Sequence, residues 1–219
     1  MRESDISLAV SSAIATSPSQ MKHTLPCTID IVTHHIPDWF TAKVDKMLPK
    51  LTFVLGGAAS GKSVWAENYI LSSRLNPVYL ATSRAFDDEI KSRIKVHKSR
   101  RSDQWRTLEH ETDLGPGLQT ITESEAVLID CATMWLTNLM MDEHDIGRAR
   151  SGLLSGMAAC RGPVVLVSNE VGHGIVPENA LARRFRDLQG RLNIALAAQA
   201  DVVVLVTAGL PQVLKGQLP

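Results

Sequence analysis

The sequence lacks several features that would place the protein in a specialised class. Its 219 residues contain no apolar run near the roughly 18–20 residues that a membrane-spanning helix needs. The N-terminus has no uninterrupted apolar segment of the secretory-signal kind, so we expect a cytoplasmic protein. The three cysteines, Cys27, Cys131 and Cys160, form no Cys-x-x-Cys pair, which argues against a disulfide framework or a cysteine-rich zinc site.

Two further deficits argue against nucleic acid as a partner. Lys and Arg total 23, as do Asp and Glu, so no net positive field would attract a polyanion. Aromatic residues make up only 5% of the chain, too few for a base-stacking platform, and we expect Trp65, Trp105 and Trp135 in the core. Any phosphate that this chain binds must therefore be held by a local site.

The chain divides into two regions of different character. Residues 1–46 are rich in Ser and Thr at first and then irregular, so we interpret them as a partly disordered N-terminal extension. Residues 47–219 have the length of one α/β domain, and Met47 at its beginning is a candidate alternative start.

From Leu51 onwards, apolar β-branched runs alternate with helical stretches. Continuous apolar runs are typical of strands that are buried on both faces. Their alternation with helices predicts an α/β fold with a mostly parallel central sheet and helices on both faces. The expected strands are 51–55, 78–81, 127–129, 164–167 and 202–206, and the expected helices are 62–73, 87–98 and 179–198.

A glycine-rich segment joins the first expected strand to the first expected helix. It reads Gly56-Gly57-Ala58-Ala59-Ser60-Gly61-Lys62-Ser63, the Gly-x-x-x-x-Gly-Lys-Ser pattern of a phosphate loop. Glycines let backbone N–H groups turn towards the β-phosphate, and the helix N-terminus favours an anion. Lys62 would bridge the β- and γ-oxygens, and the Ser63 hydroxyl would bind Mg²⁺. The sequence therefore predicts a P-loop nucleotide-binding fold that takes GTP or ATP.

An acidic residue follows the strand expected at 127–129. Taken alone, Asp130 is more typical of a turn or a helix cap. Beside a phosphate loop, we interpret it as the residue that holds Mg²⁺ through water or through Ser63.

His97 lies among five basic residues between Arg93 and Arg101. A solvated basic helix end would explain this composition. Alternatively, the cations keep the imidazole neutral, so that a nitrogen lone pair can attack phosphorus while the same cations stabilise departing pyrophosphate. Composition leaves both interpretations open.

Further motifs follow the phosphate loop in a fixed order. They are Ala81-Thr82-Ser83, Asp87-Asp88-Glu89, Arg93-Ile94-x-x-His97, Trp105-Arg106-Thr107-x-Glu109, Asp130-Cys131, Trp135-Leu136-x-Asn138-Leu139, Val167-Ser168-Asn169-Glu170-Val171-Gly172, Gly174-Ile175-Val176-Pro177-Glu178-Asn179, and the run from Leu181 to Asn193. From about Leu51 to Lys215, the chain resembles the bifunctional adenosylcobinamide kinase/adenosylcobinamide-phosphate guanylyltransferase family of cobalamin biosynthesis.

The resemblance implies two reactions on a corrinoid. A nucleoside triphosphate phosphorylates adenosylcobinamide, and a histidine then carries GMP from GTP to the product, giving adenosylcobinamide-GDP. The histidine that matches is His97, and the implied assembly is a homo-oligomer, a trimer. The implied nucleotide contacts are Gly56, Gly57, Ala58, Ala59, Ser60, Gly61, Lys62, Ser63, Thr82, Ser83, Arg84, Ser99, Arg100, Arg101, Ser102, Glu109 and Asp130.

The chain departs from the family pattern at two positions. Ala59 stands where Arg is common, and Ser102 stands where Pro often follows Arg; both changes are expected to weaken nucleotide binding. Two alternatives remain: a plain P-loop small-molecule kinase, in which His97 only contacts phosphate, and a nucleotide-dependent regulatory protein.

Several polar residues near the end of the fourth expected strand have two interpretations each. Asn169 and Glu170 follow that strand at the edge where ligands of open α/β sheets bind, and Glu170 is either a catalytic base or a structural residue. Among the arginines 183, 184, 186 and 191, one is expected to reach phosphate and others to be solvated or paired with Asp187.

Overall fold

The computed structural model describes residues 47–84 and 103–219. The extension 1–46 and the expected helix 87–98 lie outside the described residues, so both stay predictions. Within the described ranges, no helix has the length and apolar character needed to cross a membrane.

The described residues form one seven-stranded sheet with the strand order β3-β2-β4-β5-β1-β6-β7. The strands are β1 (Leu51–Gly56), β2 (Asn76–Ala81), β3 (Arg106–Glu109), β4 (Glu125–Asp130), β5 (Val164–Asn169), β6 (Val202–Thr207) and β7 (Leu210–Lys215). All neighbouring strands are parallel except β6 and β7. The mostly parallel sheet predicted from the sequence is therefore confirmed.

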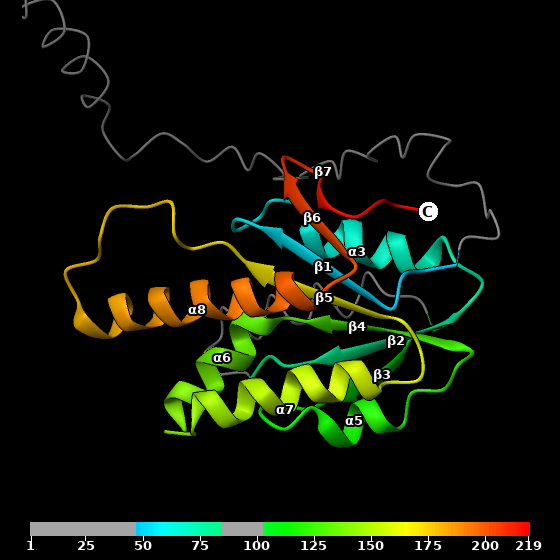
Figure 1. The fold of residues 1–219 in the computed structure, drawn as a ribbon, viewed down its shortest axis with the longest axis horizontal. Coiled ribbons are helices and arrows are strands. Elements are labelled where there is room, and N and C mark those ends of the chain that lie inside the picture. The colour runs from blue at the N-terminus through cyan, green and yellow to red at the C-terminus, as the bar shows by residue number, and fades with distance from the viewer. Residues whose placement is uncertain (1–46, 85–102) are drawn as a thin grey trace, which may run out of the picture. The chain divides into compact units, whose positions relative to one another are not determined.

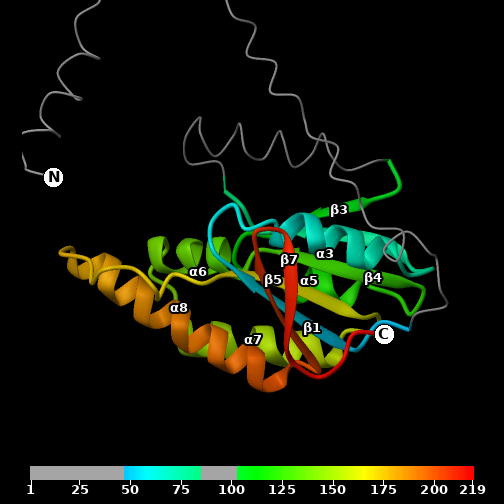
Figure 2. The ribbon, with the colours of Figure 1, turned by 90° about the horizontal axis from the view of Figure 1, so that it is seen from above.

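Helices cover both faces of the sheet, as predicted (Figures 1 and 2). On one face, α3 (Lys62–Leu71) packs Trp65 and Ile70 against β-strand side chains. On the other face lie α5 (Gly115–Gln119), α6 (Ala132–Met141), α7 (Ile146–Ala159) and α8 (Ala180–Gln199), which share a second apolar core around Trp135. Trp65, Trp105 and Trp135 are all buried, which confirms their expected place in the core.

The five expected strands are present with small shifts, and two further strands were not expected. β2 begins at Asn76, two residues earlier than expected. Pro77 is tolerated in the strand although it has no N–H, because pairing with β3 starts only at Val78, while the Asn76 N–H donates to the Ser124 carbonyl on the β4 side. β3 is short, and β7 is an exposed edge strand held by its pairing with β6. Neither has the continuous apolar run of a buried strand.

The carboxyl ends of the parallel strands meet at one edge of the sheet. In the sheet order, β5 separates β1 from β4, so the end of β5 lies between the predicted phosphate loop and Asp130. The register pairs Gly56 with Asn169 and Asp130 with Val167. This edge brings together residues that are distant in sequence, such as Gly56 and Asn169.

Candidate functional site

The phosphate loop lies at the carboxyl end of β1, where helix α3 begins. The helix is preceded by Gly61 in a left-handed conformation (φ +89°), and no side chain caps its N-terminus. The first N–H groups of α3 are therefore available to an anion, which the helix dipole also favours. Strand, loop and helix have the arrangement of a P-loop nucleotide-binding fold, as predicted.

Lys62 places its ammonium group inside this loop. Its Nζ donates a hydrogen bond to the Gly57 carbonyl at 3.0 Å, and the side chain is largely buried. Burial lowers the pKa of Lys62 below its ordinary value, while the neighbouring Cys131 and Asp130 oppose the shift. A triphosphate would supply the negative charge that this buried cation lacks.

The turn between β6 and β7 packs against the phosphate loop. A Cβ atom on Gly61 would lie 3.0 Å from the Cα of Gly209 in that turn, and the Gly209 N–H donates to the Ser60 carbonyl at 2.8 Å. A Cβ atom on Gly56 would lie 2.3 Å from Ser60 Oγ and 2.7 Å from the Val206 carbonyl oxygen. These glycines are thus required by close packing as well as by the expected ligand.

Ala58 and Ala59 form the exposed part of the loop. Ala59 has a positive φ of 53°, and its methyl group adds no polar contact. In this chain the described groups of the loop that could bind phosphate are therefore the backbone donors, Lys62 and the half-buried Ser63.

Asp130 ends β4 on the far side of β5 from the phosphate loop. Its Oδ2 accepts a hydrogen bond from the Tyr79 hydroxyl at 3.0 Å, which orients the carboxylate at the sheet edge. The described residues contain no group of three His, Cys, Asp or Glu side chains that could enclose a metal. Ser63 and Asp130 supply hard oxygen atoms that suit Mg²⁺, with phosphates and water completing its ligands.

Thr82 and Cys131 connect the ends of β2 and β4. The Thr82 hydroxyl donates to the Cys131 carbonyl and accepts from the Cys131 N–H, both at 2.8 Å. Thr82 is fully buried, so its side chain anchors the backbone here, and its nucleotide contact stays a prediction. Burial raises the pKa of the Cys131 thiol to about 12, so this thiol is not a nucleophile at neutral pH.

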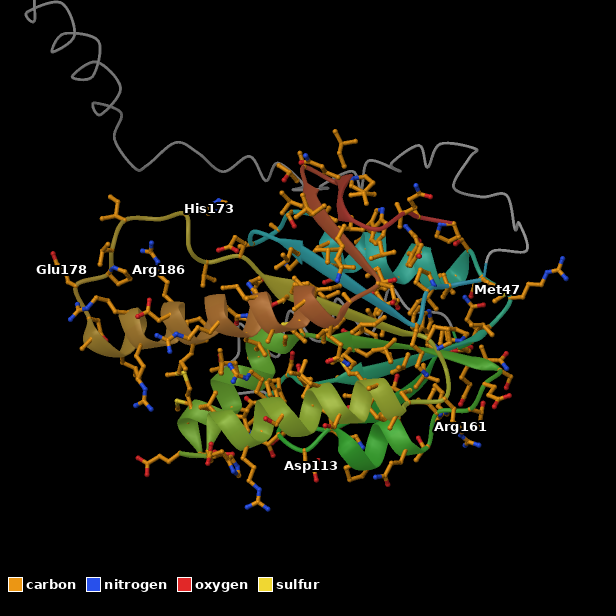
Figure 3. All side chains as sticks on the ribbon, in the orientation of Figure 1. Met47, Asp113, Arg161, His173, Glu178 and Arg186 are labelled. Atoms are coloured by element: carbon orange, nitrogen blue, oxygen red, sulfur yellow. The ribbon has the colours of Figure 1, made fainter. Side chains whose placement is uncertain are left out.

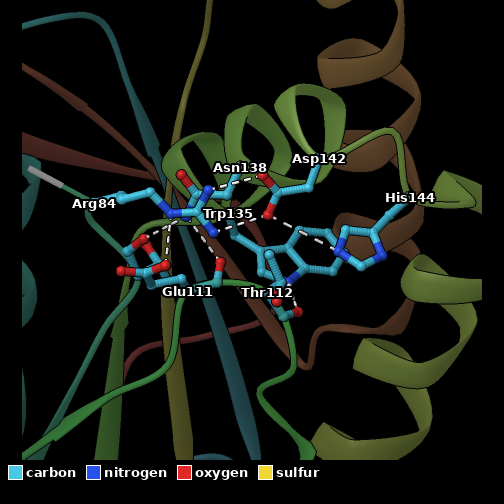
Figure 4. Close-up of polar contacts among 8 residues, drawn as sticks. Arg84, Glu111, Thr112, Trp135, Asn138, Asp142 and His144 are labelled. Atoms are coloured by element: carbon cyan, nitrogen blue, oxygen red, sulfur yellow. Dashed lines mark hydrogen bonds and ion pairs between the residues drawn. The ribbon is translucent and has the colours of Figure 1, made fainter. Parts of the chain in front are cut away.

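Arg84 joins the segment after β2 to two other segments (Figure 4). Its Nε lies 2.5 Å from Glu111, and its two terminal nitrogens bind the Asp142 carboxylate at 2.9 and 2.8 Å. The guanidinium lowers the pKa of Asp142. Ser83 and Arg84 are half-buried, and the nucleotide contacts predicted for them also stay predictions.

One face of α6 holds the segments that follow β2 and β3 (Figure 4). Trp135 Nε1 donates to the Thr112 carbonyl at 2.7 Å. Asn138 Nδ2 donates to the carbonyls of Thr82 and Glu111 at 2.7 and 2.8 Å. Sequence reasoning gave Asn138 no role, although a polar residue within an apolar helical pattern was a usable signal.

The remaining predicted contacts are farther away or outside the described residues. Glu109 ends β3 and is exposed, and three strands separate β3 from β1 in the sheet. His97 and the segment from Ser99 to Ser102 lie outside the described residues, so their roles stay predictions.

Asn169 and Glu170 lie directly beside the phosphate loop. The Glu170 N–H donates to the Gly56 carbonyl at 3.1 Å, and its carboxylate accepts from the Gly172 N–H at 2.6 Å. Their expected place at the ligand-binding edge is confirmed. A carboxylate and a carboxamide thus stand between the loop and Asp130.

Two arginines of α8 bind the loop that joins β5 to α8; one of them, Arg186, is labelled in Figure 3 together with His173 and Glu178 of the loop. Arg183 and Arg186 donate to carbonyl oxygens of that loop rather than to Asp187. The accepting residues are Gly172, Gly174, Ile175, Pro177 and Glu178. His173 in the same loop is exposed.

The sequence matches a protein-family model and is similar to proteins of known name. Residues 52–214 match the family model described as cobinamide kinase/cobinamide phosphate guanyltransferase. The chain is 42% identical over 167 residues to the bifunctional adenosylcobalamin biosynthesis protein CobP of Pseudomonas aeruginosa, covering 75% of this chain and 96% of that protein. It is 41% identical over 176 residues to the bifunctional adenosylcobalamin biosynthesis protein CobU of Escherichia coli K12, covering 73% and 97%.

Among solved structures, similarity is much lower. The flagellar accessory protein FlaH of Methanocaldococcus jannaschii has a TM-score of 0.45 at 14% identity, covering 83% of this chain and 85% of that one. The type III secretion ATPase EscN of enteropathogenic E. coli has a TM-score of 0.46 at 10% identity, covering 75% and 45%. Similarity this low carries no argument about function.

The family model and the named relatives decide the assignment, and the chain belongs to the cobinamide kinase/cobinamide phosphate guanyltransferase family.

Proposed function

We propose that this protein phosphorylates adenosylcobinamide with a nucleoside triphosphate and then transfers GMP from GTP to the product, in cobalamin biosynthesis. The observation that carries the proposal is the uncapped N-terminus of α3, with the Lys62 ammonium inside the loop and Glu170 beside it. Family membership supports the corrinoid as the acceptor and the second activity.

In the phosphoryl transfer, the substrate hydroxyl oxygen forms a bond to the γ-phosphorus. The bond from that phosphorus to the β–γ bridging oxygen breaks, and the nucleoside diphosphate leaves with the electron pair. Lys62 and the first N–H groups of α3 stabilise the charge on the phosphates. Glu170 is the carboxylate placed beside the loop that can take the hydroxyl proton.

Ser63 and Asp130 are the residues that would hold Mg²⁺. Their oxygen donors and their position at one sheet edge fit the ion, which when bound neutralises charge on the triphosphate. Tyr79 keeps the Asp130 carboxylate oriented for this purpose.

In the guanylyl transfer, a ring nitrogen of His97 attacks the α-phosphorus of GTP. The bond to the bridging oxygen breaks, pyrophosphate leaves with the electron pair, and GMP stays on the histidine as a phosphoramidate. A phosphate oxygen of the phosphorylated corrinoid then attacks this phosphorus, the P–N bond breaks, and the imidazole is regenerated. The basic residues around His97 would stabilise the departing pyrophosphate.

Labelled GTP separates this proposal from its two alternatives. Label from α-³²P-GTP should become protein-bound, acid-labile and base-stable, whereas γ-³²P-GTP should leave no such label. His97→Ala should abolish the label, and His144→Ala, which changes a half-exposed histidine in the turn between α6 and α7, should retain it.

Each contrary outcome points to one alternative. If no α-label forms while adenosylcobinamide is still phosphorylated, the protein is a plain kinase. If the nucleotide binds but neither reaction occurs, a nucleotide-dependent regulatory role is favoured. We further propose that the enzyme acts in the cytoplasm as a homo-oligomer, a trimer, with no nucleic-acid partner.

A further inference from the structure

Strand β5 extends beyond its neighbour β4 at the ligand-binding edge. Pairing with β4 ends at Val167, whereas pairing with β1 continues to Asn169 opposite Gly56. The Glu170 N–H points towards β1, so the backbone N–H and carbonyl of Asn169 point to the other side, because successive residues alternate along a strand. On that side β4 provides no ladder partner.

Two side chains replace the missing strand partner. The Thr133 hydroxyl accepts from the Asn169 N–H at 2.9 Å, and Asn193 Nδ2 donates to the Asn169 carbonyl at 3.1 Å. Thr133 lies in the first turn of α6 and Asn193 lies on α8, and each residue is only 6% exposed. The backbone of Asn169 is therefore held on this side by two helices, through buried contacts.

A group of buried polar side chains orients Asn193. Its Oδ1 accepts from the Ser168 hydroxyl at 2.8 Å and from Gln189 Nε2 at 2.9 Å. Gln189 also donates to the Ser168 oxygen at 2.9 Å. Because Oδ1 receives two donors, the Nδ2 group of Asn193 is the end that faces Asn169. Burying so many polar groups is costly unless they are bonded, which indicates a specific positional requirement.

The side chain of Asn169 lies on the opposite face of β5. Ser168 faces α8, and side chains alternate along a strand, so Asn169 is on the face that carries α3 and the phosphate loop. Its Oδ1 is buried, and no residue in the described part of the chain hydrogen-bonds to it. A buried acceptor left unpaired costs free energy, so a ligand that supplies a donor here would recover that loss.

We propose that Asn169 is a catalytic residue of the phosphoryl transfer and that Thr133 and Asn193 are its positioning residues. This inference rests on the kinase activity proposed above. A carboxamide offers one acceptor and two N–H donors. A phosphoryl group with its attacking hydroxyl needs this combination: the phosphoryl oxygens accept from Nδ2, and the hydroxyl donates to Oδ1 on binding and turns its proton to Glu170 as its oxygen bonds to phosphorus. Asn169 would thereby align the two reacting groups beside Glu170.

The test measures kcat and KM for adenosylcobinamide phosphorylation by the full chain. Asn169→Asp keeps the size but replaces the donor with a negative charge, so kcat should fall about 100-fold while the KM for ATP changes little. Thr133→Val removes the acceptor for the Asn169 N–H and should lower kcat about ten-fold, whereas Thr133→Ser should restore it. Thermal midpoints of all variants show whether they are folded.

Guanylylation provides the second readout. Attack on the α-phosphorus does not involve the transferred phosphoryl group, so α-³²P labelling should change much less than kcat in Asn169→Asp. If wild-type protein phosphorylates the corrinoid and folded Asn169→Asp does so at the wild-type rate, the assignment of Asn169 is wrong. If wild-type protein has no such activity, the proposed kinase function itself is wrong. An equal loss of kcat in Thr133→Val and Thr133→Ser would contradict the positioning role of Thr133.

Discussion

The phosphate loop and the end of β5 lie side by side at one sheet edge, yet they are built in different ways. The loop consists of consecutive residues, and the groups that we propose bind phosphate are backbone N–H groups, Lys62 and Ser63. The end of β5 is held by side chains from α6 and α8, which are 36 and 24 residues from Asn169 in the sequence. One region is a local motif, and the other exists only after the helices have packed.

This difference determines what a substitution should do. A change within the loop removes a ligand contact or strains a local turn. A change in Thr133 or Asn193 removes no side chain that is proposed to touch the ligand, but it should shift the position of Asn169. Changes at the loop test its local character, in order of decreasing expected effect.

The largest effect is expected for Lys62→Ala. The variant loses the ammonium group that would stabilise the transferring phosphoryl oxygens, so phosphoryl transfer should fall about 100- to 1,000-fold. Steady-state kinetics measures the change. Lys215→Ala is the matched control, because Lys215 also donates to backbone carbonyls, at the far end of β7. A Lys62→Ala enzyme with wild-type kcat would contradict the ligand role of the loop.

A smaller effect is expected for Gly61→Ala. The methyl group would meet the β6–β7 turn at 3.0 Å and would occupy a backbone with φ +89°, so nucleotide affinity should fall about ten-fold and the thermal midpoint should decrease. Gly57→Ala is the matched change in the same loop, since a Cβ atom there has no neighbour within 4 Å. Nucleotide titration and thermal unfolding compare the two variants. Equal loss of stability in both would show that packing of the turn does not matter.

The smallest effect is expected from alkaline pH. Burial holds the pKa of Lys62 below its ordinary value of 10.5 in the free protein, and bound phosphates should raise it. Nucleotide affinity should therefore fall as pH rises through the lowered pKa, with proton uptake on binding. The unfolded chain binds more protons than the native one in this window, so the free energy of unfolding should rise with pH there.

Calorimetric titrations in two buffers of different ionisation enthalpy measure this proton uptake. Lys62→Met is the control and should show none at alkaline pH. Proton uptake that persists in Lys62→Met would assign the linkage to another group.

Sequence reasoning found the features that depend on neighbouring residues. The buried strands, the helix after the phosphate loop and the strand that ends at Asp130 all have local patterns, and all are present. Helix α3 ends two residues early because the hydroxyls of Ser72 and Ser73 bind the carbonyls of Tyr69 and Ile70. β7 was missed because an exposed edge strand lacks the apolar run of a buried one.

The features that sequence reasoning missed depend on pairs of distant residues. Asn138 on α6 holds the ends of β2 and β3, and Asn193 on α8 holds the end of β5. Each is a polar residue inside an apolar helical pattern, and the pattern does not identify its partner. The partner is defined only by which strand end the packed helix reaches.

By itself, the sequence determined the strand–loop–helix unit around Gly61 and Lys62, the parallel sheet and the family. These follow from short-range patterns, because a phosphate loop needs glycines, a lysine and a helix N-terminus in consecutive positions. Only the tertiary structure decided that Asn169 lies beside that loop with an unpaired buried oxygen, supported by Thr133 and Asn193. The physical reason is that β5 extends beyond the end of β4. The last backbone N–H and carbonyl of β5 therefore hydrogen-bond to side chains, which reach them only when α6 and α8 pack against the sheet.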